Sequence, residues 1–435
     1  MSFTLYQKYE SSGVEWLEKL PSHWYVKKLK QACLVFPSNV DKKSYEDEES
    51  VYLCNYTDVY YSEKIVAGMD FMKATASKEQ VDKFTLKAGD TIITKDSETA
   101  DDIGISAFVP DDIPGVICGY HLSIIRPKID TDGKFIKYFF SSHFAKSKLA
   151  VAATGLTRVG LSQYAIDNLQ LPYPLTTEQI AIANFLDCET TKIDALIAEQ
   201  EKLMNLLREK RQSVISHAVT KGLDPKVTMK DSGIKWLGEV PEHWELKKIK
   251  WCAKLKNEKT SDRSNTIALE NIESWTGRFI DTESEFEGDG VKFYEGDVLF
   301  GKLRPYLAKV FRATMSGEAI GDFFVLEPNQ NLLSQFAERL FISSEFIDAI
   351  NSSTYGTKMP RVNWEYFSSM SIPLPPKHEQ IQISNYLVTA IEEMDELIAT
   401  SINAVDLLEE RRSALISAAV TGQIDVRNYQ PKEAV

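Results

Sequence analysis

The sequence has little cysteine and no long apolar run, and both absences limit what the chain is. Its five cysteines are scattered without a Cys-x-x-Cys pair, so we expect free thiols and no zinc site. No stretch reaches the ~18 apolar residues that span a bilayer. The N-terminal MSFTLYQKYESSGVEW lacks the basic and then apolar pattern of a signal peptide. We therefore expect a cytoplasmic protein without a membrane contact.

Signatures of catalysis and of cofactor binding are also missing. The chain has no Asp/Asn-Pro-Pro-Tyr/Phe motif of amino-methyltransferases, no glycine-rich cofactor loop, no Walker lysine loop and no His-Glu-x-x-His. We expect no catalytic residue, metal or cofactor in this chain. The formal net charge of −13 argues against a sequence-blind polyanion binder, although a local basic groove can act within an acidic protein.

What the chain does contain is an internal repeat. The segment SGVEWLEKLPSHWYVKKLK at 12–30 returns as SGIKWLGEVPEHWELKKIK at 232–250, an offset of 220 residues. LPYPLTTEQIAIANFLD from Leu171 returns as IPLPPKHEQIQISNYLV from Ile372, an offset of 201 residues. The segments between the matched blocks differ almost completely, and the second is 19 residues shorter. A repeated frame with two unlike inserts indicates one kind of task performed on two targets.

The repeated block that closes each copy predicts a long helix with a heptad-like apolar stripe. The stripes are Leu186, Ile193, Leu196, Leu203, Leu207, Val214 and Ala218 in the first copy, and Ile383, Leu387, Met394, Leu397, Ala404, Leu408, Leu415 and Ala419 in the second. Since a lone helix of roughly 45 residues with one apolar stripe is unstable in water, we predict that the two pair. The duplicated order favours an antiparallel, pseudo-twofold pair. The alternative is two independent helices, each packed on its own domain.

The bodies between the repeated blocks are predicted to be mixed α/β. We expect strands within 87–95, 104–110 and 115–127 of the first body, and within 294–311 and 318–328 of the second. Amphipathic helices are expected at Lys134–Ser147 and Asn331–Asn351. The predicted fold class is α+β, with two α/β domains related by pseudo-twofold symmetry and separated by two long antiparallel coiled-coil helices.

Histidines and tryptophans also pair across the repeat. His23 and His243 each stand in Pro-x-His-Trp ahead of a strand, and we interpret both as packing residues. The paired tryptophans are expected to be core or helix-docking anchors. They are Trp16, Trp24, Trp236 and Trp244.

Basic and polar residues gather in glycine-punctuated loops of both bodies, once after a strand and once further along. They are Lys95, Ser97, Thr157 and Arg158 in the first body, and Lys302, Arg304, Tyr306, Lys358 and Arg361 in the second. Arginine suits guanine O6 and N7, whereas lysine, serine and threonine suit phosphate. One such cluster is more often a solvated loop. Their recurrence at equivalent positions favours contacts to DNA.

Taken together, the repeated frame resembles the specificity subunit of a type I restriction-modification system. The resemblance rests on SGVEWLEKLPSHW and SGIKWLGEVPEHW, on GDVLFGKLRPYLAK in the second body, and on Pro-x-Pro-x-x-x-Glu-Gln-x-x-Ile at Pro172–Ile182 and Pro373–Ile383. It rests also on the endings LLREKRQSVISHAVTKG and LLEERRSALISAAVTGQ, and it covers nearly the whole chain. The first body departs from the pattern, because TKDSETADD stands where the second has GKLRPYLAK.

The resemblance implies a domain organisation and a set of partners. Residues 1–170 and 223–373 would be target recognition domains, each reading one half of a split DNA sequence. Residues 171–222 and 374–435 would supply the spacer helices, the latter with a C-terminal tail. Two methyltransferase subunits, which bind S-adenosylmethionine, would dock on the helices, and restriction subunits would join the complex. The partner contacts expected on the helices are Leu186, Ile193, Leu207, Leu387, Met394 and Leu408.

Two other classes of function compete with this interpretation. The acidic charge is compatible with a scaffold whose variable bodies bind proteins and not DNA. A fused nuclease or methyltransferase is disfavoured by the missing motifs.

Overall fold

The computed structural model describes residues 4–260, 265–282, 289–356 and 358–430. The chain forms two compact units, and each of two long helices contributes to both. The first unit contains the chain up to Glu199 and again from Asn403, and the second contains Gln200–Ile402. The domain boundaries, in which each helix is a segment of its own, stay a prediction.

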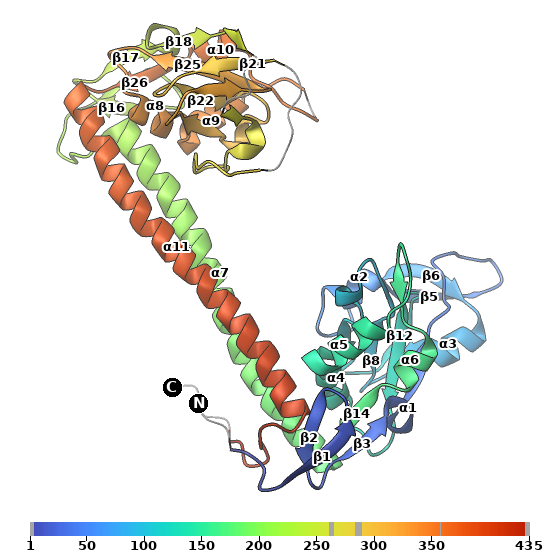
Figure 1. Ribbon diagram of the computed structural model, residues 1–435. Coiled ribbons are helices and arrows are strands. Elements are labelled where there is room, and N and C mark those ends of the chain that lie inside the picture. Colours follow the sequence, from blue (N-terminus) through green and yellow to red (C-terminus); the bar gives the residue numbers. More distant parts are fainter. Residues whose placement is uncertain (1–3, 261–264, 283–288, 357, 431–435) are drawn as a thin grey trace. The chain divides into compact units, whose positions relative to one another are not determined.

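In the first unit, two four-stranded sheets form the body (Figure 1). One has the order β10-β8-β12-β4: Ser106–Phe108, Thr91–Thr94, Leu122–Pro127 and Cys33–Pro37. The other has the order β6-β5-β11-β7: Met72–Ala76, Glu49–Cys54, Ile113–Cys118 and Thr85–Leu86. Two-stranded sheets are β1 (Tyr9–Val14) with β2 (Leu17–Pro21), β3 (Tyr25–Lys28) with β14 (Gln170–Tyr173), and β9 (Asp96–Ser97) with β13 (Val159–Gly160). The helices are α1 (Leu29–Ala32), α2 (Tyr56–Tyr60), α3 (Lys78–Phe84), α4 (Gly133–Ser141), α5 (His143–Ala152) and α6 (Gln163–Asp167).

The second unit repeats this plan. Its sheet β18-β25-β22-β23 consists of Ala253–Lys256, Phe323–Pro328, Val298–Gly301 and Val310–Arg312. Its sheet β19-β21-β24-β20 consists of Lys259–Thr260, Gly290–Phe293, Gly317–Ala319 and Thr266–Ile267. The pairs are β15 (Met229–Asp231) with β16 (Glu239–Pro241) and β17 (Glu245–Lys248) with β26 (Ser371–Leu374), and the body helices are α8 (Ser334–Phe341), α9 (Ser344–Asn351) and α10 (Trp364–Ser369). Within the described residues, the strands of both units pair mainly antiparallel, with β5–β11 and β20–β24 as parallel pairs. Mainly antiparallel sheets beside helices confirm the predicted α+β class.

Several predicted segments are interrupted. The expected strand 115–127 is β11 and β12 with a turn at Gly119. The expected helix Lys134–Ser147 breaks at Ser142, whose backbone is extended (ψ 148°) and whose hydroxyl caps α5 by accepting from Ala145 N. The expected helix Asn331–Asn351 breaks at the equivalent Ser343 (ψ 145°). Apolar periodicity continues across these breaks, so it did not reveal them.

The two long helices are α7 (Thr176–Lys221) and α11 (Lys377–Val420) (Figure 1). In the first unit, Ile182, Leu186 and Ile193 near the start of α7 share a core with the end of α11 around Ile416. In the second unit the end of α7 around Ile215 shares a core with the start of α11. Both contacts are antiparallel, as predicted. The strands β14 and β26, which contain Pro172 and Pro373, come before the two long helices in the chain.

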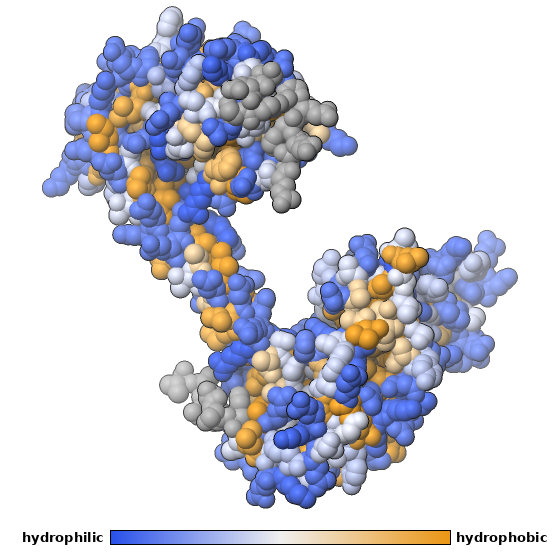
Figure 2. Space-filling model, viewed as in Figure 1, coloured by the Kyte–Doolittle hydropathy of each residue, from blue (hydrophilic) through white to orange (hydrophobic). Residues whose placement is uncertain are grey.

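The apolar stripes are buried only towards the helix ends. Leu186 and Ile193 are buried in the first unit, and Leu387 is buried in the second. Leu196 and Leu397, which occupy equivalent places, are 52% and 53% exposed, and Leu203 is also exposed. The two helices therefore pack through their stripes towards the ends, as predicted, whereas apolar residues nearer the middle of each stripe are exposed. The chain itself leaves apolar side chains on the helices uncovered, and Figure 2 shows apolar residues at the helix surface.

The paired histidines hold the repeated glutamates at the start of each long helix. His23 Nε2 lies 3.0 Å from Glu178 Oε2, and His243 Nε2 lies 2.6 Å from Glu379 Oε1. Each histidine thus connects the opening motif of its copy to the closing motif, which confirms a structural role. Trp24 and Trp244 are buried and Trp236 is partly buried, as expected of anchors, whereas Trp16 is exposed, so the prediction for Trp16 is wrong.

Candidate nucleic-acid interface

Three loops meet at one place in the first unit. They are the loop that follows β8 at Lys95, the β11–β12 turn at His121, and the loop between α5 and α6. Lys95 N donates to His121 O at 3.0 Å, and Lys95 O accepts from Leu161 N at 2.8 Å. Pairing of β9 with β13 places Ser97 opposite Val159. The two stretches that the sequence singled out in this body therefore lie together.

The second unit builds the same three-loop cluster. Lys302 N donates to Asp322 O at 2.8 Å, and Lys302 O accepts from Val362 N at 3.0 Å. A β-bridge pairs Leu303 with Arg361, the counterpart of Asp96 with Gly160 in the first unit. The backbone geometry is thus common to both units, although the side chains in these loops are not.

In the second unit the cluster presents cations around one carboxylate. Arg361 Nη2 lies 2.7 Å from Asp322 Oδ2, and Lys302 Nζ lies 3.8 Å from Asp322 Oδ1. Lys358 and Tyr306 are exposed beside them. Arg361 is exposed and Lys302 is half-buried, and cations held by a single carboxylate can exchange it for phosphate or a base edge.

Arg304 has an unusual backbone conformation in this cluster. Its φ is +48° and its ψ is 58°, in the left-handed region, directly before the 3₁₀ turn Pro305–Leu307. Arg304 N donates to Pro360 O at 2.7 Å, which ties this residue to the later loop. Its Nε is buried without a hydrogen-bond partner among the described residues. Strained residues of this kind cost about 1–3 kcal/mol and gather at functional sites.

The first unit presents a different set of side chains. Thr157 and Arg158 are exposed, as a surface contact requires. Lys95 Nζ donates to Ser38 O at 3.0 Å and lies 4.8 Å from the centre of the Tyr120 ring. Ser97 is only 3% exposed, so its hydroxyl supports the loop cluster and is not presented to a ligand.

Residues that the sequence did not single out also surround this cluster. Asp96 Oδ2 lies 3.0 Å from His121 Nδ1, and Tyr60 donates to Asp102 Oδ2. Two carboxylates of the acidic loop after β8 are therefore bound within the protein. Tyr56 stacks on Tyr60 with ring centres 5.5 Å apart, and Tyr61 is 80% exposed. The tyrosine-rich stretch YTDVYYS after Asn55 was the sequence signal that could have pointed to these aromatic residues. Asp58 accepts a hydrogen bond from Asn55 N and so caps the start of α2.

The side chains expected to bind partners lie mostly inside the protein. Leu186, Ile193 and Leu387 fill the cores of their own units and offer no surface in this structure. Leu207, Met394 and Leu408 are half-buried. On the two long helices, the large apolar residues that are both repeated and exposed are Ile180 with Ile381, Leu196 with Leu397, and Leu206 with Leu407. The heptad pattern contains both buried and exposed residues, so it did not separate the core of each unit from the helix surface.

Searches of the described residues for a metal site and a membrane span give no candidate. No group of three or more histidine, cysteine, aspartate or glutamate side chains there is arranged to hold a metal ion. No helix in the same part of the chain is long and apolar enough to cross a membrane.

Comparisons with known proteins agree with the two-unit architecture. The family model of the type I restriction modification DNA specificity domain matches twice, at residues 21–204 and 241–407. The chain is 26% identical over 283 residues to the type I restriction enzyme EcoDI specificity subunit of Escherichia coli, covering 60% of this chain and 63% of that protein. It is 23% identical over 312 residues to the MjaVIII specificity subunit of Methanocaldococcus jannaschii, covering 67% of this chain and 70% of that protein.

Two solved structures share the fold. A chain from a study of assembly and conformational transition of the type I R-M system superposes with a TM-score of 0.69 at 15% identity, over 92% of this chain and 98% of that one. The HsdS subunit from Thermoanaerobacter tengcongensis gives 0.53 at 15% identity, over 95% and 100%. Because the family model covers most of the sequence in two matching segments, the chain belongs to the specificity subunits of type I restriction-modification systems.

Proposed function

We propose that this chain reads an asymmetric, bipartite DNA sequence, one half-site with each three-loop cluster. The observation that carries the proposal is that one backbone arrangement is built twice with unlike side chains. A shared arrangement suits the shared shape of the double helix, whereas unlike side chains suit unlike base pairs. The recognition domains would be residues 1–170 and 223–373, with 171–222 and 374–435 as the frame.

In the second unit we assign base reading to Arg304 and Arg361 and phosphate contacts to Lys302 and Lys358. Arginine reads guanine through two parallel hydrogen bonds, whereas lysine acts as a point charge. Tyr306 would pack against the DNA beside them. In the first unit Arg158, Thr157 and Lys95 are the corresponding candidates, and the exposed Tyr61 adds an apolar contact.

The long helices would fix the spacing of the two half-sites. The helices α7 and α11 have 46 and 44 residues. At ~1.5 Å per residue each spans about 65 Å, which is enough to hold two domains on half-sites separated by ~34 Å, one turn of DNA. The spacer in the recognised sequence would then follow the helix length.

The helices would also dock two methyltransferase subunits, and restriction subunits would join through them. A duplicated surface suits two copies of one partner, and the exposed, repeated Leu196/Leu397 and Leu206/Leu407 are candidate contacts. Large exposed apolar side chains often mark protein interfaces. Specificity subunits of this family are non-catalytic, so S-adenosylmethionine would bind the methyltransferase partner. The complex would act in the cytoplasm.

The test is to co-express the chain with its methyltransferase partner, incubate the complex with random duplex DNA and S-adenosylmethionine, and sequence the methylated molecules. The proposal predicts N6-methyladenine in two unlike half-sites at one fixed spacing. A contiguous site, or no enrichment of any sequence, would contradict it. A salt-independent complex with a protein, formed without DNA, would support the alternative of a protein-binding scaffold.

A further inference from the structure

One arginine and one aspartate of the repeated frame link the two long helices in each unit. In the first unit, Arg412 Nε of α11 donates to Asp194 Oδ1 of α7 at 2.7 Å. In the second unit the equivalent residues have exchanged helices, and Arg211 Nε of α7 lies 3.5 Å from Asp395 Oδ1 of α11. We call each pair the Arg–Asp junction of its unit. Both arginine side chains are largely buried.

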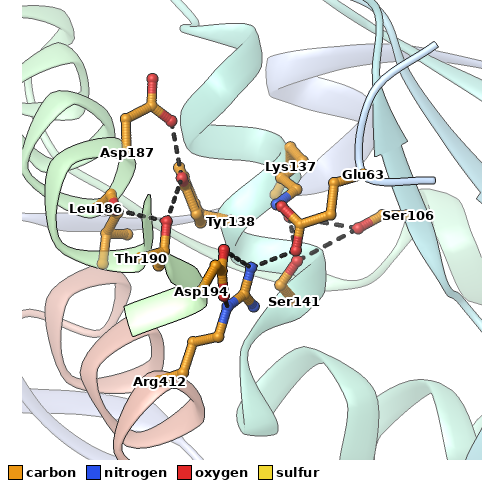
Figure 3. Close-up of polar contacts among 10 residues, drawn as sticks. All are labelled: Glu63, Ser106, Lys137, Tyr138, Ser141, Leu186, Asp187, Thr190, Asp194 and Arg412. Carbon is orange, nitrogen blue, oxygen red and sulfur yellow. Dashed lines mark hydrogen bonds and ion pairs between the residues drawn. The ribbon is translucent and has the colours of Figure 1, made fainter. Parts of the chain in front are cut away.

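In the first unit the variable body supplies a carboxylate, that of Glu63, to the arginine of the junction (Figure 3). Glu63, in the loop between α2 and β6, accepts from Arg412 Nη2 and also from Lys137 Nζ of α4 at 2.8 Å. Beside them Tyr138 Oη donates to Asp187 Oδ1 of α7 at 2.7 Å. Polar contacts of the body thus reach both long helices.

In the second unit the variable body contacts the aspartate of the junction, whereas in the first unit it contacts the arginine. Arg278 Nη2 lies 2.6 Å from Asp395 Oδ2, so the body supplies a cation to the aspartate. Arg211 Nη1 donates to the backbone carbonyl of Trp275 at 2.7 Å. Trp275 holds a φ of +65°, a left-handed conformation that turns the chain at this contact.

The two bodies therefore contact the same Arg–Asp junction with groups of opposite charge, a carboxylate in the first unit and a guanidinium in the second. The arginine and aspartate belong to the repeated frame, whereas Glu63, Lys137 and Arg278 belong to the segments that do not repeat. A second repeated contact lies nearby, because Ser417 Oγ accepts from His143 N at 3.0 Å and the equivalent Ser216 Oγ accepts from Ser344 N at 3.2 Å. The serine contact is the same in both units, whereas the contacts that the bodies make with the Arg–Asp junction differ.

We propose that the Arg–Asp junction is a positioning element that receives unlike recognition domains and sets the angle of each domain to the helices. This proposal rests on the proposed function, because the angle matters for the spacing and helical phase of two half-sites on DNA. Lys137 is only 7% exposed, so loss of Glu63 leaves a buried cation without its partner. Arg412, Asp194, Arg211 and Asp395 are then positioning residues and contact no DNA.

The first test needs no DNA. Nitroxide labels at Thr157→Cys in the body and Asp406→Cys on α11 would report their distance distribution in the full chain, with Cys188→Ser to remove the most exposed native thiol. Arg412→Ala should broaden the distribution about twofold or more, Arg412→Lys should partly restore it, and Glu410→Ala on the same helix should leave it unchanged. Glu63→Gln, a milder change, should broaden it as well. Unchanged distributions in folded Arg412→Ala and Glu63→Gln would overturn the proposal.

The second test uses duplexes that carry both half-sites, once these have been mapped, at the native spacing and at one base pair more or less. The wild-type complex should prefer the native spacing, and Arg412→Ala should reduce that preference about tenfold. An equal loss of affinity at all spacings would show a merely structural role and overturn the proposal. If the wild-type complex bound no duplex, the proposed function would fail, while the label distances would still decide whether the junction positions the body.

Discussion

Gln179 and Gln380 make the same hydrogen bonds in the two units. Gln179 Nε2 donates to Pro174 O at 2.9 Å, and its Oε1 accepts from Asp132 N at 2.9 Å. Gln380 Nε2 donates to Pro375 O at 2.8 Å, and its Oε1 accepts from Leu333 N at 2.9 Å. Each glutamine joins the start of a long helix to the residue directly before a body helix, Asp132 before α4 and Leu333 before α8. The repeated motif is thus a joint of the frame.

Replacing either glutamine by alanine should destabilise its own unit. Both side chains are fully buried, and truncation leaves backbone groups without their partner, at a cost of about 1–3 kcal/mol. Urea unfolding would measure the loss, with Gln382→Ala, an exposed position on α11, as the matched control. Equal midpoints for Gln380→Ala and Gln382→Ala would show that the joint adds no stability.

Arg304→Ala and Arg361→Ala should each weaken binding to the specific sequence by ~1–3 kcal/mol if the side chains read bases. Binding to unrelated DNA should change less, because phosphate contacts from Lys302 and Lys358 remain. Titration of labelled duplexes at fixed salt would measure both affinities. Arg208→Ala, an exposed arginine on α7, is the control. Wild-type affinity in both variants would remove these arginines from the interface.

Glutamate at Leu196 and Leu397 together should weaken association with the methyltransferase subunit at least about tenfold, or ~1.4 kcal/mol. Both positions are half-exposed, and glutamate favours helix, so the chain should remain folded. Co-purification and calorimetry would report the association. Val151→Glu, an exposed change on α5, should have no effect. Undiminished association of the double variant would place the dock elsewhere.

The contribution of Glu63 to stability should disappear in acid. Burial raises its pKa, but Lys137 and Arg412 outweigh burial and hold the pKa below its usual range. Its contribution is therefore complete above the unfolded pKa of ~4.3 and is lost as the pH falls through the lower folded pKa. Because Glu63 is half-exposed, the effect should be about 1 kcal/mol or less. Urea midpoints of wild type and Glu63→Gln should differ at pH 7 and converge once the pH has fallen below the lowered pKa of Glu63 in the folded chain. A difference that persists in acid would contradict this assignment.

The sequence predicted the frame well because the repeat carries it. His23, Gln179 and their counterparts recur because each copy must make the same joints, and the spacing of apolar residues predicted both long helices. The candidate site was predicted in part, since the loops at Lys95 and Lys302 occupy equivalent places in the structure. The predictions that were wrong concern residues whose role depends on their surroundings in the folded chain. The hydroxyl of Ser142 breaks a helix whose apolar pattern continues, and Ser97 lies under its neighbours, although both look like ordinary polar residues in the sequence.

The most direct measurement is a genome-wide map of N6-methyladenine in the host cell, with the wild-type chain and with a variant of longer helices. The variant carries four extra residues after Asn205 in α7 and four more near Ser401 in α11, which keeps the antiparallel helices matched. Four residues add ~6 Å, or roughly two base pairs of DNA. We predict that the wild-type chain directs methylation to two unlike half-sites at one spacing, and that the variant keeps both half-sites and lengthens the spacer. An unchanged spacer in an active variant would contradict the proposal that the helices set the spacing. Methylation that does not depend on the chain would contradict the proposal that the chain reads the sequence.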